Sequence, residues 1–254
     1  MGFSIFRLID IMYLKLTKRP MYIHFYIRKK RLSNDDKAIL QNKFFFYRKL
    51  KPKNKIYFEH RVVNFIENKE FVGRDGLFVD DEKRLLIAAT AVMLTFGMRD
   101  YLIRILKRVI VYPDIFYSNI NKDYHKGEFN PMLGALVLSW KDFEKGFMIE
   151  DDNLNLGIHE FTHAIHLDSL KKSNLWALIF SKGLDELLFV LDDAEIKDRM
   201  VSSDYFRAYA YTNKFEFLAV VVENFIESPE QFKVSFPEIY YQLRDMFNFR
   251  FAGY

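Results

Sequence analysis

The sequence of 254 residues predicts an α+β fold with a mainly helical core and a small sheet. Half of the residues are hydrophobic and only 10 are glycine, which is typical of a globular chain that buries a large core. Apolar residues recur at helical spacing along most of the chain. Two strand-like runs precede helices without strict alternation, which favours α+β over a doubly wound parallel sheet.

The N-terminal segment differs from the rest in charge. The first 60 residues carry 15 Lys/Arg and 4 Asp/Glu, whereas the remaining residues carry 23 and 30. We therefore expect a basic N-terminal arm over residues 1–54 and a main domain over residues 55–254. Residues 51–55, Lys-Pro-Lys-Asn-Lys, are a predicted turn or linker between them. Within the arm, Ser33 or Asn34 can cap a helix over roughly 35–48.

The apolar run at residues 1–16 does not predict a membrane span or a secretory signal. Arg7, Asp10 and Lys15 interrupt it, and it lacks a small-residue cleavage site. We therefore expect a cytoplasmic protein. A basic arm can meet nucleic acid, an anionic membrane face or an acidic protein, but a solvated extension is the simpler interpretation.

The first half of the main domain alternates helical and turn patterns. Asp80 or Asp81 can cap a helix that runs to Phe96 and closes at Gly97, and its apolar residues on all sides place it centrally. Before it, Gly73 and Gly76 mark a turn, and a further helix is predicted from five residues at helical spacing: Phe58, Val62, Val63, Phe65 and Ile66.

Two short strands are predicted in the middle of the chain. The first covers residues 108–112 and is stopped by Pro113, and the second covers 135–140 and is opened by Gly134. The polar and aromatic segment between them, residues 114–131, is predicted to be a long loop.

Three helices are predicted in the second half of the chain. One runs from Asp151 to about Leu170, with Asp151, Asp152 or Asn153 as its cap. The other two cover about 204–228 and 236–248.

The predicted helix ending near Leu170 contains the sequence His159-Glu160-Phe161-Thr162-His163, a complete H-E-x-x-H motif. Residues four apart lie on one face of a helix, so His159 and His163 can both bind one metal ion. Glu160 then points to the same cavity and can act as the general base. The chain contains no cysteine, so any metal must be held by His, Asp or Glu.

A catalytic zinc site needs a third protein ligand, and a glutamate from a later helix is the best candidate. Glu216 lies within an otherwise apolar segment, where an unpaired carboxylate is costly, and this favours a functional role. Glu223 lies on the same face and either orients a histidine ligand or faces solvent. Glu227 and Glu230 are expected on the surface. His166 is expected to be a supporting or core histidine rather than a ligand.

At this point the sequence resembles the Mlc titration factor A family of zinc-dependent peptidases. The resemblance rests on His159–His163 and on residues 209–217, which read Tyr-Ala-Tyr-Thr-Asn-Lys-Phe-Glu-Phe. The same two blocks are similar to the catalytic domain of anthrax lethal factor. The resemblance covers about residues 55–235, and the N-terminal arm matches the family weakly.

The resemblance implies a zincin-like metallopeptidase of the gluzincin type, with aminopeptidase activity as one option. It implies one zinc ion per chain on His159, His163 and Glu216, Glu160 as general base activating a zinc-bound water, and Tyr209 as the group that steadies the oxyanion. The strand at 134–140 would be the edge strand that pairs with an extended peptide substrate.

One position departs from the family pattern, and one rival function stays open. The family has an aspartate where this chain has His166, and Asp168 follows two residues later. The rival is a regulatory protein that binds a transcriptional repressor or another partner, with weak or vestigial peptidase activity. Its support is the basic arm. Nucleic-acid binding is not expected, because the run at 28–31 lacks interleaved glycines or a helix-turn-helix pattern.

Overall fold

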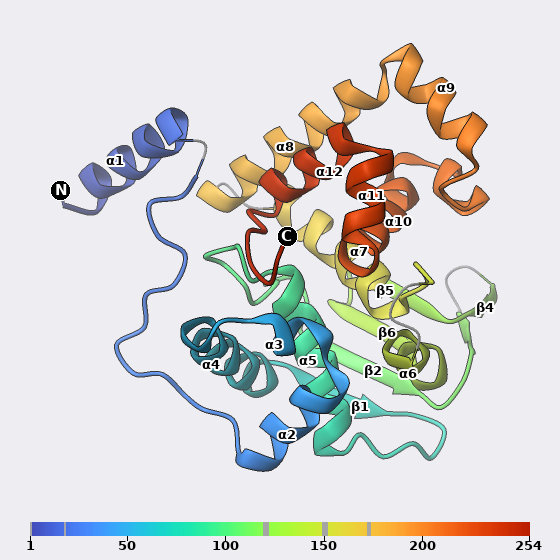
Figure 1. Ribbon diagram of the computed structural model, residues 1–254. Coiled ribbons are helices and arrows are strands. Elements are labelled where there is room, and N and C mark those ends of the chain that lie inside the picture. The colour runs from blue at the N-terminus through green and yellow to red at the C-terminus, as the bar shows by residue number, and fades with distance from the viewer. Residues whose placement is uncertain (1, 18, 119–121, 149–151, 172–173) are drawn as a thin grey trace.

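The computed structural model describes residues 2–17, 19–118, 122–148, 152–171 and 174–254 (Figure 1). Helices make up most of it and surround one four-stranded sheet, which confirms the predicted α+β class. In the described part of the chain, no helix has the length and apolar character needed to cross a bilayer.

The sheet has the strand order β1-β2-β6-β5. β1 (Glu70–Gly73), β2 (Arg108–Tyr112) and β6 (Ala135–Ser139) run parallel, and β5 (Gly127–Asn130) is antiparallel to β6. The two predicted strands are therefore confirmed. The expectation that the strand at 134–140 lies at the edge is wrong, because β6 lies between β2 and β5, and β5 is the edge strand.

The segment at 114–131 is not the long loop that its composition predicts. It contains β5 and a two-stranded antiparallel sheet of β3 (Phe116–Ser118) and β4 (Asp123–His125). These strands are three or four residues long, and Tyr117 and Tyr124 lie exposed on them. Runs this short with exposed aromatic residues do not give the alternating pattern by which strands are recognised.

The single helix predicted at 35–48 is two helices, α2 (Asn34–Lys43) and α3 (Phe45–Lys49). Ser33 caps α2 through a capping box with Asp36. Phe44 between them has an extended backbone, and its ring is fully buried. Burial of this ring against the core therefore outweighs the continuity of the helix.

Residues 51–55 do not form the predicted linker. Pro52 begins α4 (Pro52–Asn68), since a missing N–H costs nothing at the first helical position. Side chains from α2 and α3 belong to the same core cluster as those of the main domain, so the core extends back to Leu32. The division of the chain at residue 54 stays a prediction.

The central helices are α5 (Asp81–Leu94) and α7 (Leu156–Leu170). Asp80 caps α5 by accepting a hydrogen bond from the Lys83 N–H, as predicted, and every residue from Leu85 to Leu94 is buried. α7 contacts α5, β5 and β6 on one side and α10 (Lys214–Glu227) on another. Its position between the sheet and the C-terminal helices is visible in Figure 1.

The C-terminal part is more divided than the sequence predicts. Instead of one helix over 204–228, the left-handed Asp204 ends α9 (Ala194–Ser203), a 3-10 turn η1 (Ala208–Tyr211) follows, and Asn213 caps α10. The helix predicted at 236–248 is α12 (Pro237–Met246). The remaining helices are α6 (Trp140–Met148), α8 (Leu175–Leu191) and α11 (Pro229–Ser235).

The N-terminal residues lie along one side of the molecule. α1 (Gly2–Thr17) stands apart from the other helices, and the chain that follows runs along the body to α2 (Figure 1).

Candidate metal centre

The helix α7 carries the H-E-x-x-H motif, and its start is set by Asn155. The Asn155 side chain accepts a hydrogen bond from the Ile158 N–H at 3.0 Å. Of the predicted caps, Asp152 and Asn153 precede this residue without capping the helix, and Asp151 lies outside the described residues. Asn153 has a left-handed backbone (φ 56°), which turns the chain before the helix begins.

His159 and His163 lie one turn apart on the same face of α7, as their spacing predicts. Their Nε2 atoms are 3.1 Å apart. Both side chains are largely buried. Two imidazole nitrogens this close can share one metal ion.

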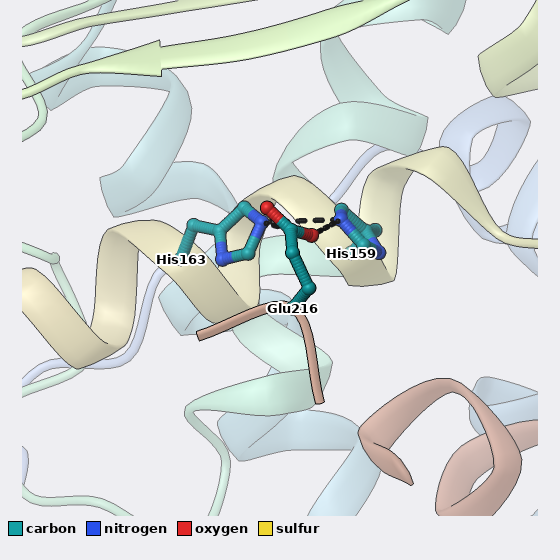
Figure 2. A group of neighbouring side chains, drawn as sticks. All are labelled: His159, His163 and Glu216. Carbon is teal, nitrogen blue, oxygen red and sulfur yellow. Dashed lines mark hydrogen bonds and ion pairs between the residues drawn. The ribbon is translucent and has the colours of Figure 1, made fainter. Parts of the chain in front are cut away.

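Glu216 joins them from the first turn of α10. Asn213 caps α10 by accepting hydrogen bonds from the N–H groups of Phe215 and Glu216, which places Glu216 beside α7. Its Oε2 lies 2.9 Å from Nε2 of His159 and 3.3 Å from Nε2 of His163. The three ligand atoms lie within 4.8 Å of one another, so this group could hold a metal (Figure 2).

The electrostatics of the group favour a bound cation. Burial by itself lowers the pKa of His159, but hydrogen bonds with Glu216 and Glu223 outweigh it and raise the pKa to about 9. Burial would raise the pKa of Glu216, yet both histidines hold it well below its usual range. The carboxylates that stabilise a proton on His159 would stabilise a divalent cation at the same place.

Glu160 lies on the wall of a cavity of about 420 Å³ that also reaches His159 and Tyr209. It is 6% exposed, and burial raises its pKa to about 7; His159 lowers it, and the carboxylate of Glu216 adds to the rise. Gly127 of β5 passes directly over it. A Cβ at Gly127 would lie 2.7 Å from the Glu160 carboxylate, so only glycine leaves room there.

Tyr209 lies on η1, beside the metal-binding group. Its ring centroid is 5.9 Å from that of His159. Burial and the charge of Glu216 raise its pKa to about 12. The phenol is therefore a neutral hydrogen-bond donor at the edge of the cavity.

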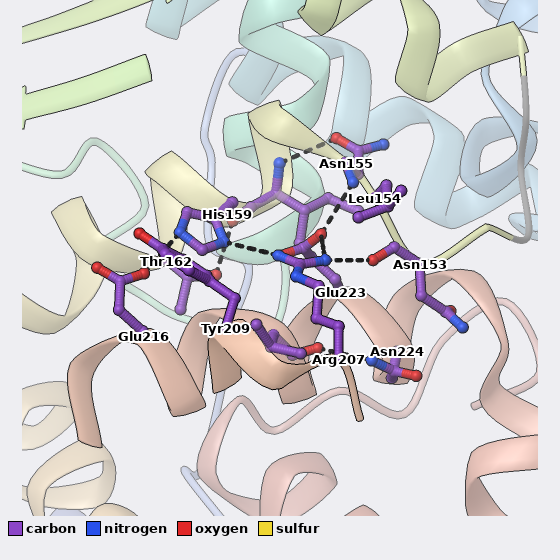
Figure 3. Close-up of polar contacts among 12 residues, drawn as sticks. Asn153, Leu154, Asn155, His159, Thr162, Arg207, Tyr209, Glu216, Glu223 and Asn224 are labelled. Atoms are coloured by element: carbon purple, nitrogen blue, oxygen red, sulfur yellow. Dashed lines mark hydrogen bonds and ion pairs between the residues drawn. The ribbon is translucent and has the colours of Figure 1, made fainter. Parts of the chain in front are cut away.

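Glu223 faces His159 rather than solvent, which settles the two alternatives that the sequence left open (Figure 3). Its Oε1 lies 2.7 Å from Nδ1 of His159. Its Oε2 accepts a hydrogen bond from the backbone N–H of Asn155 at 2.9 Å. The side chain is 1% exposed. A carboxylate in this position fixes the ring orientation and the tautomer of the histidine.

Arg207 is a residue of the site that sequence reasoning missed. Its Nη2 donates to Oε1 of Glu223 at 2.7 Å and its Nη1 donates to Oε2 at 2.9 Å. Nη1 also donates to the carbonyl of Asn153 at 2.6 Å. Arg207 lies outside any ligand spacing, and the only signal is a cation among the aromatic residues that precede Glu216.

The expectation that Glu227 is a surface residue is wrong. It is 9% exposed, and its Oε1 accepts a hydrogen bond from Nδ2 of Asn155 at 2.9 Å. Burial raises its pKa to about 8. The buried face of α10 continues one turn beyond Glu223, and this brings Glu227 against the cap of α7. Glu230 is exposed, as expected.

Two residues near the end of α7, His166 and Asp168, serve other parts of the fold. His166 lies outside the metal-binding group and contacts the rings of Phe180 and Phe215, which agrees with a core role. Asp168 accepts a hydrogen bond from the backbone N–H of Ile105 at 3.1 Å, and so holds the loop before β2. The ring of His163 is held by a different contact from that of His159, because it stacks on the ring of Phe215 with the two centroids 3.9 Å apart.

Two comparisons with known proteins bear on the family of this chain. The chain is 26% identical over 229 residues to an uncharacterised protein of Synechocystis sp.. The aligned region covers 82% of this chain and 81% of that protein. The sequence model of one family, described as glucose-regulated metallo-peptidase M90, matches residues 17–248. The resemblance that the two motif blocks indicate is thereby confirmed, and the chain belongs to the family of glucose-regulated metallo-peptidases M90.

Proposed function

We propose that this chain is a zinc-dependent peptidase of the gluzincin type, with one zinc ion held by His159, His163 and Glu216. The observation that carries the proposal is the convergence of these three donors within 4.8 Å, with Glu160 beside them. Two imidazoles and one carboxylate form a catalytic zinc site that leaves a fourth position open. The metallopeptidase family supports the same reading.

When bound, zinc would supply Lewis acidity, which lowers the pKa of a water molecule toward ~7 and polarises a scissile carbonyl. The proton chemistry then falls to Glu160. A carboxyl group with a pKa of about 7 can take a proton from the attacking water and return it to the leaving amine near neutral pH.

Tyr209 would donate a hydrogen bond to the oxyanion that forms at the scissile carbonyl. Its raised pKa supports this role, because the phenol keeps its proton over the whole working pH range. The ring is half exposed, so it can turn toward a bound peptide.

The edge strand β5 is the substrate-pairing strand in this proposal. β5 pairs with β6 on one side, and in the described part of the chain no strand covers its other side. An extended peptide can add to such an edge through main-chain hydrogen bonds. Gly127 lies on β5 next to Glu160, so a peptide on this edge would pass close to the general base.

Two variants test the proposal. Glu160→Gln should keep one zinc per chain by mass spectrometry and lose peptidase activity against a peptide library. Glu216→Ala should lose zinc. Wild-type activity in Glu160→Gln, or full zinc content in Glu216→Ala, would contradict it. A wild-type chain that binds zinc but cleaves no peptide would favour the regulatory alternative, which stays a prediction.

A further inference from the structure

The apolar side of α1 faces solvent. Ile9, Met12, Tyr13 and Leu16 follow the spacing i, i+3, i+4, i+7 and therefore share one face of the helix. Their side chains are 48%, 55%, 40% and 83% exposed. An amphipathic helix of a globular protein normally packs this face on the core, so its exposure calls for a partner.

A polar contact holds α1 in this orientation. Asp10 is 3% exposed and faces the body of the protein, where its Oδ2 accepts a hydrogen bond from Nη1 of Arg99 at 2.6 Å. The guanidinium of Arg99 also lies 3.7 Å from the ring centroid of Tyr22. Asp10 is thus directed inward, while the four apolar side chains named above are exposed.

The segment that follows α1 also exposes apolar and basic side chains. Phe25 and Ile27 are 75% and 89% exposed, and four exposed cations come directly after them: Arg28, Lys29, Lys30, which pairs with Glu67, and Arg31, which pairs with Glu59. Residues 1–31 contain 8 Lys/Arg and one acidic residue, Asp10, which Arg99 pairs. α1 and this segment lie along one side of the molecule (Figure 1). We call residues 9–31 the arm surface.

We propose that the arm surface binds the face of an anionic lipid bilayer. A bilayer offers an apolar layer for Ile9, Met12 and Leu16 and negative headgroups for the cations next to them. A second copy of this chain would bring two strongly basic surfaces together across a symmetric interface. Nucleic acid would neutralise the cations but leave the aliphatic face in water.

Membrane attachment would leave the cavity open. The cavity is lined by Tyr124 and His125 of β4, by Gly127 of β5, and by residues of α7. In Figure 1, β4 lies on the opposite side of the molecule from α1. The attached protein could therefore meet peptides at or near a membrane face, and this surface does not depend on the proposed peptidase activity.

Co-sedimentation with vesicles tests the proposal. The full chain is mixed with phosphatidylcholine vesicles that contain either no anionic lipid or about 30 mol% phosphatidylglycerol. We expect binding to the anionic vesicles, which weakens as salt is added. Leu16→Glu should weaken this binding by about tenfold or more, because it removes an apolar side chain that the bilayer would bury. Val234→Glu is the matched control, since Val234 on α11 is 84% exposed.

A second variant tests the charges. Arg28→Gln combined with Lys29→Gln should weaken binding by about fivefold for each charge removed. Circular dichroism and zinc content verify that each variant is folded. The proposal is overturned if the chain does not bind anionic vesicles, or if Leu16→Glu binds them as well as Val234→Glu. A dimer in solution that Leu16→Glu converts to monomer, without vesicle binding, would assign the surface to a second copy instead.

Discussion

Two histidines, one in the candidate metal centre and one in the N-terminal arm, occupy opposite environments. His159 has carboxylates at both ring nitrogens, Glu216 at Nε2 and Glu223 at Nδ1, and its pKa is raised to about 9. His24 stacks on Tyr57, with ring centroids 4.5 Å apart. Among the described residues neither of its nitrogens has a hydrogen-bond partner, and burial together with the Arg61 charge lowers its pKa to about 2.

The neighbours of a histidine, rather than its burial, therefore decide its chemistry. Burial lowers the pKa of both residues. In the metal centre, carboxylates from α10 reverse that effect and create a site for a cation. In the arm, aromatic rings and Arg61 reinforce it, so His24 stays neutral and serves as a packing residue.

The largest expected effect comes from removing the carboxylate that touches both imidazoles. Glu216→Ala would take away the proposed third ligand and the negative charge beside His159 and His163. We expect the zinc dissociation constant to rise by more than about 100-fold, beyond the range of supporting residues. Competition with a chromophoric chelator measures it. An unchanged constant would mean that the third ligand is misassigned.

Glu223→Gln should have the next largest effect. The glutamine amide cannot balance the charge of Arg207, and it accepts a hydrogen bond from Nδ1 of His159 less strongly than the carboxylate does. We therefore expect zinc affinity to fall by about 10- to 100-fold. Glu230→Gln is the control, because Glu230 is an exposed glutamate that begins the next helix. Equal affinities for the two variants would show that the contact between Glu223 and His159 does not support the metal.

His24 should make the fold less stable in mild acid. Its pKa is lowered in the folded state, so it contributes stability above the unfolded pKa of about 6.5, and that stability is lost as pH falls. Near pH 5.5, about one unit below that value, the loss approaches about 1.4 kcal/mol. Arg61 and Lys53 are the cations that face it, and Tyr26 and Tyr57 are its aromatic neighbours.

His24→Phe should reduce this pH dependence. Urea unfolding at pH 7.5 and pH 5.5 measures it, as the difference between variant and wild type at each pH. His125→Phe is a control in which a partly buried histidine outside the arm is changed in the same way. If His24→Phe and the wild type lose the same free energy of unfolding on acidification, His24 is not the source of the pH dependence.

Arg207→Lys should give the smallest effect. Lysine keeps the charge but cannot donate to both Glu223 oxygens as the guanidinium does. We expect zinc affinity to fall by about threefold to tenfold, with more loss in Arg207→Met, which leaves Glu223 without its cation. Similar affinities for lysine, methionine and arginine at this position would limit Arg207 to holding the carbonyl of Asn153.

The features that depend on local geometry could be predicted from the amino-acid sequence alone. The spacing of His159 and His163 within one helix placed both on one face, because helical periodicity needs no tertiary information. Glu216 could be chosen because a carboxylate in an apolar segment needs a partner. The cap at Asp80 and the buried α5 followed in the same way from local pattern.

The long-range partners of each residue could not be predicted in this way and are known from the fold. Glu223 and Glu227 both lie on α10, and the contacts that bury them come from His159 and Asn155, more than 60 residues earlier in the chain. β6 became an interior strand because a segment without strand periodicity supplied β5. Arg207 entered the site through a turn between two helices. Contacts of this kind leave no periodic signal in the sequence, because they depend on how distant elements pack.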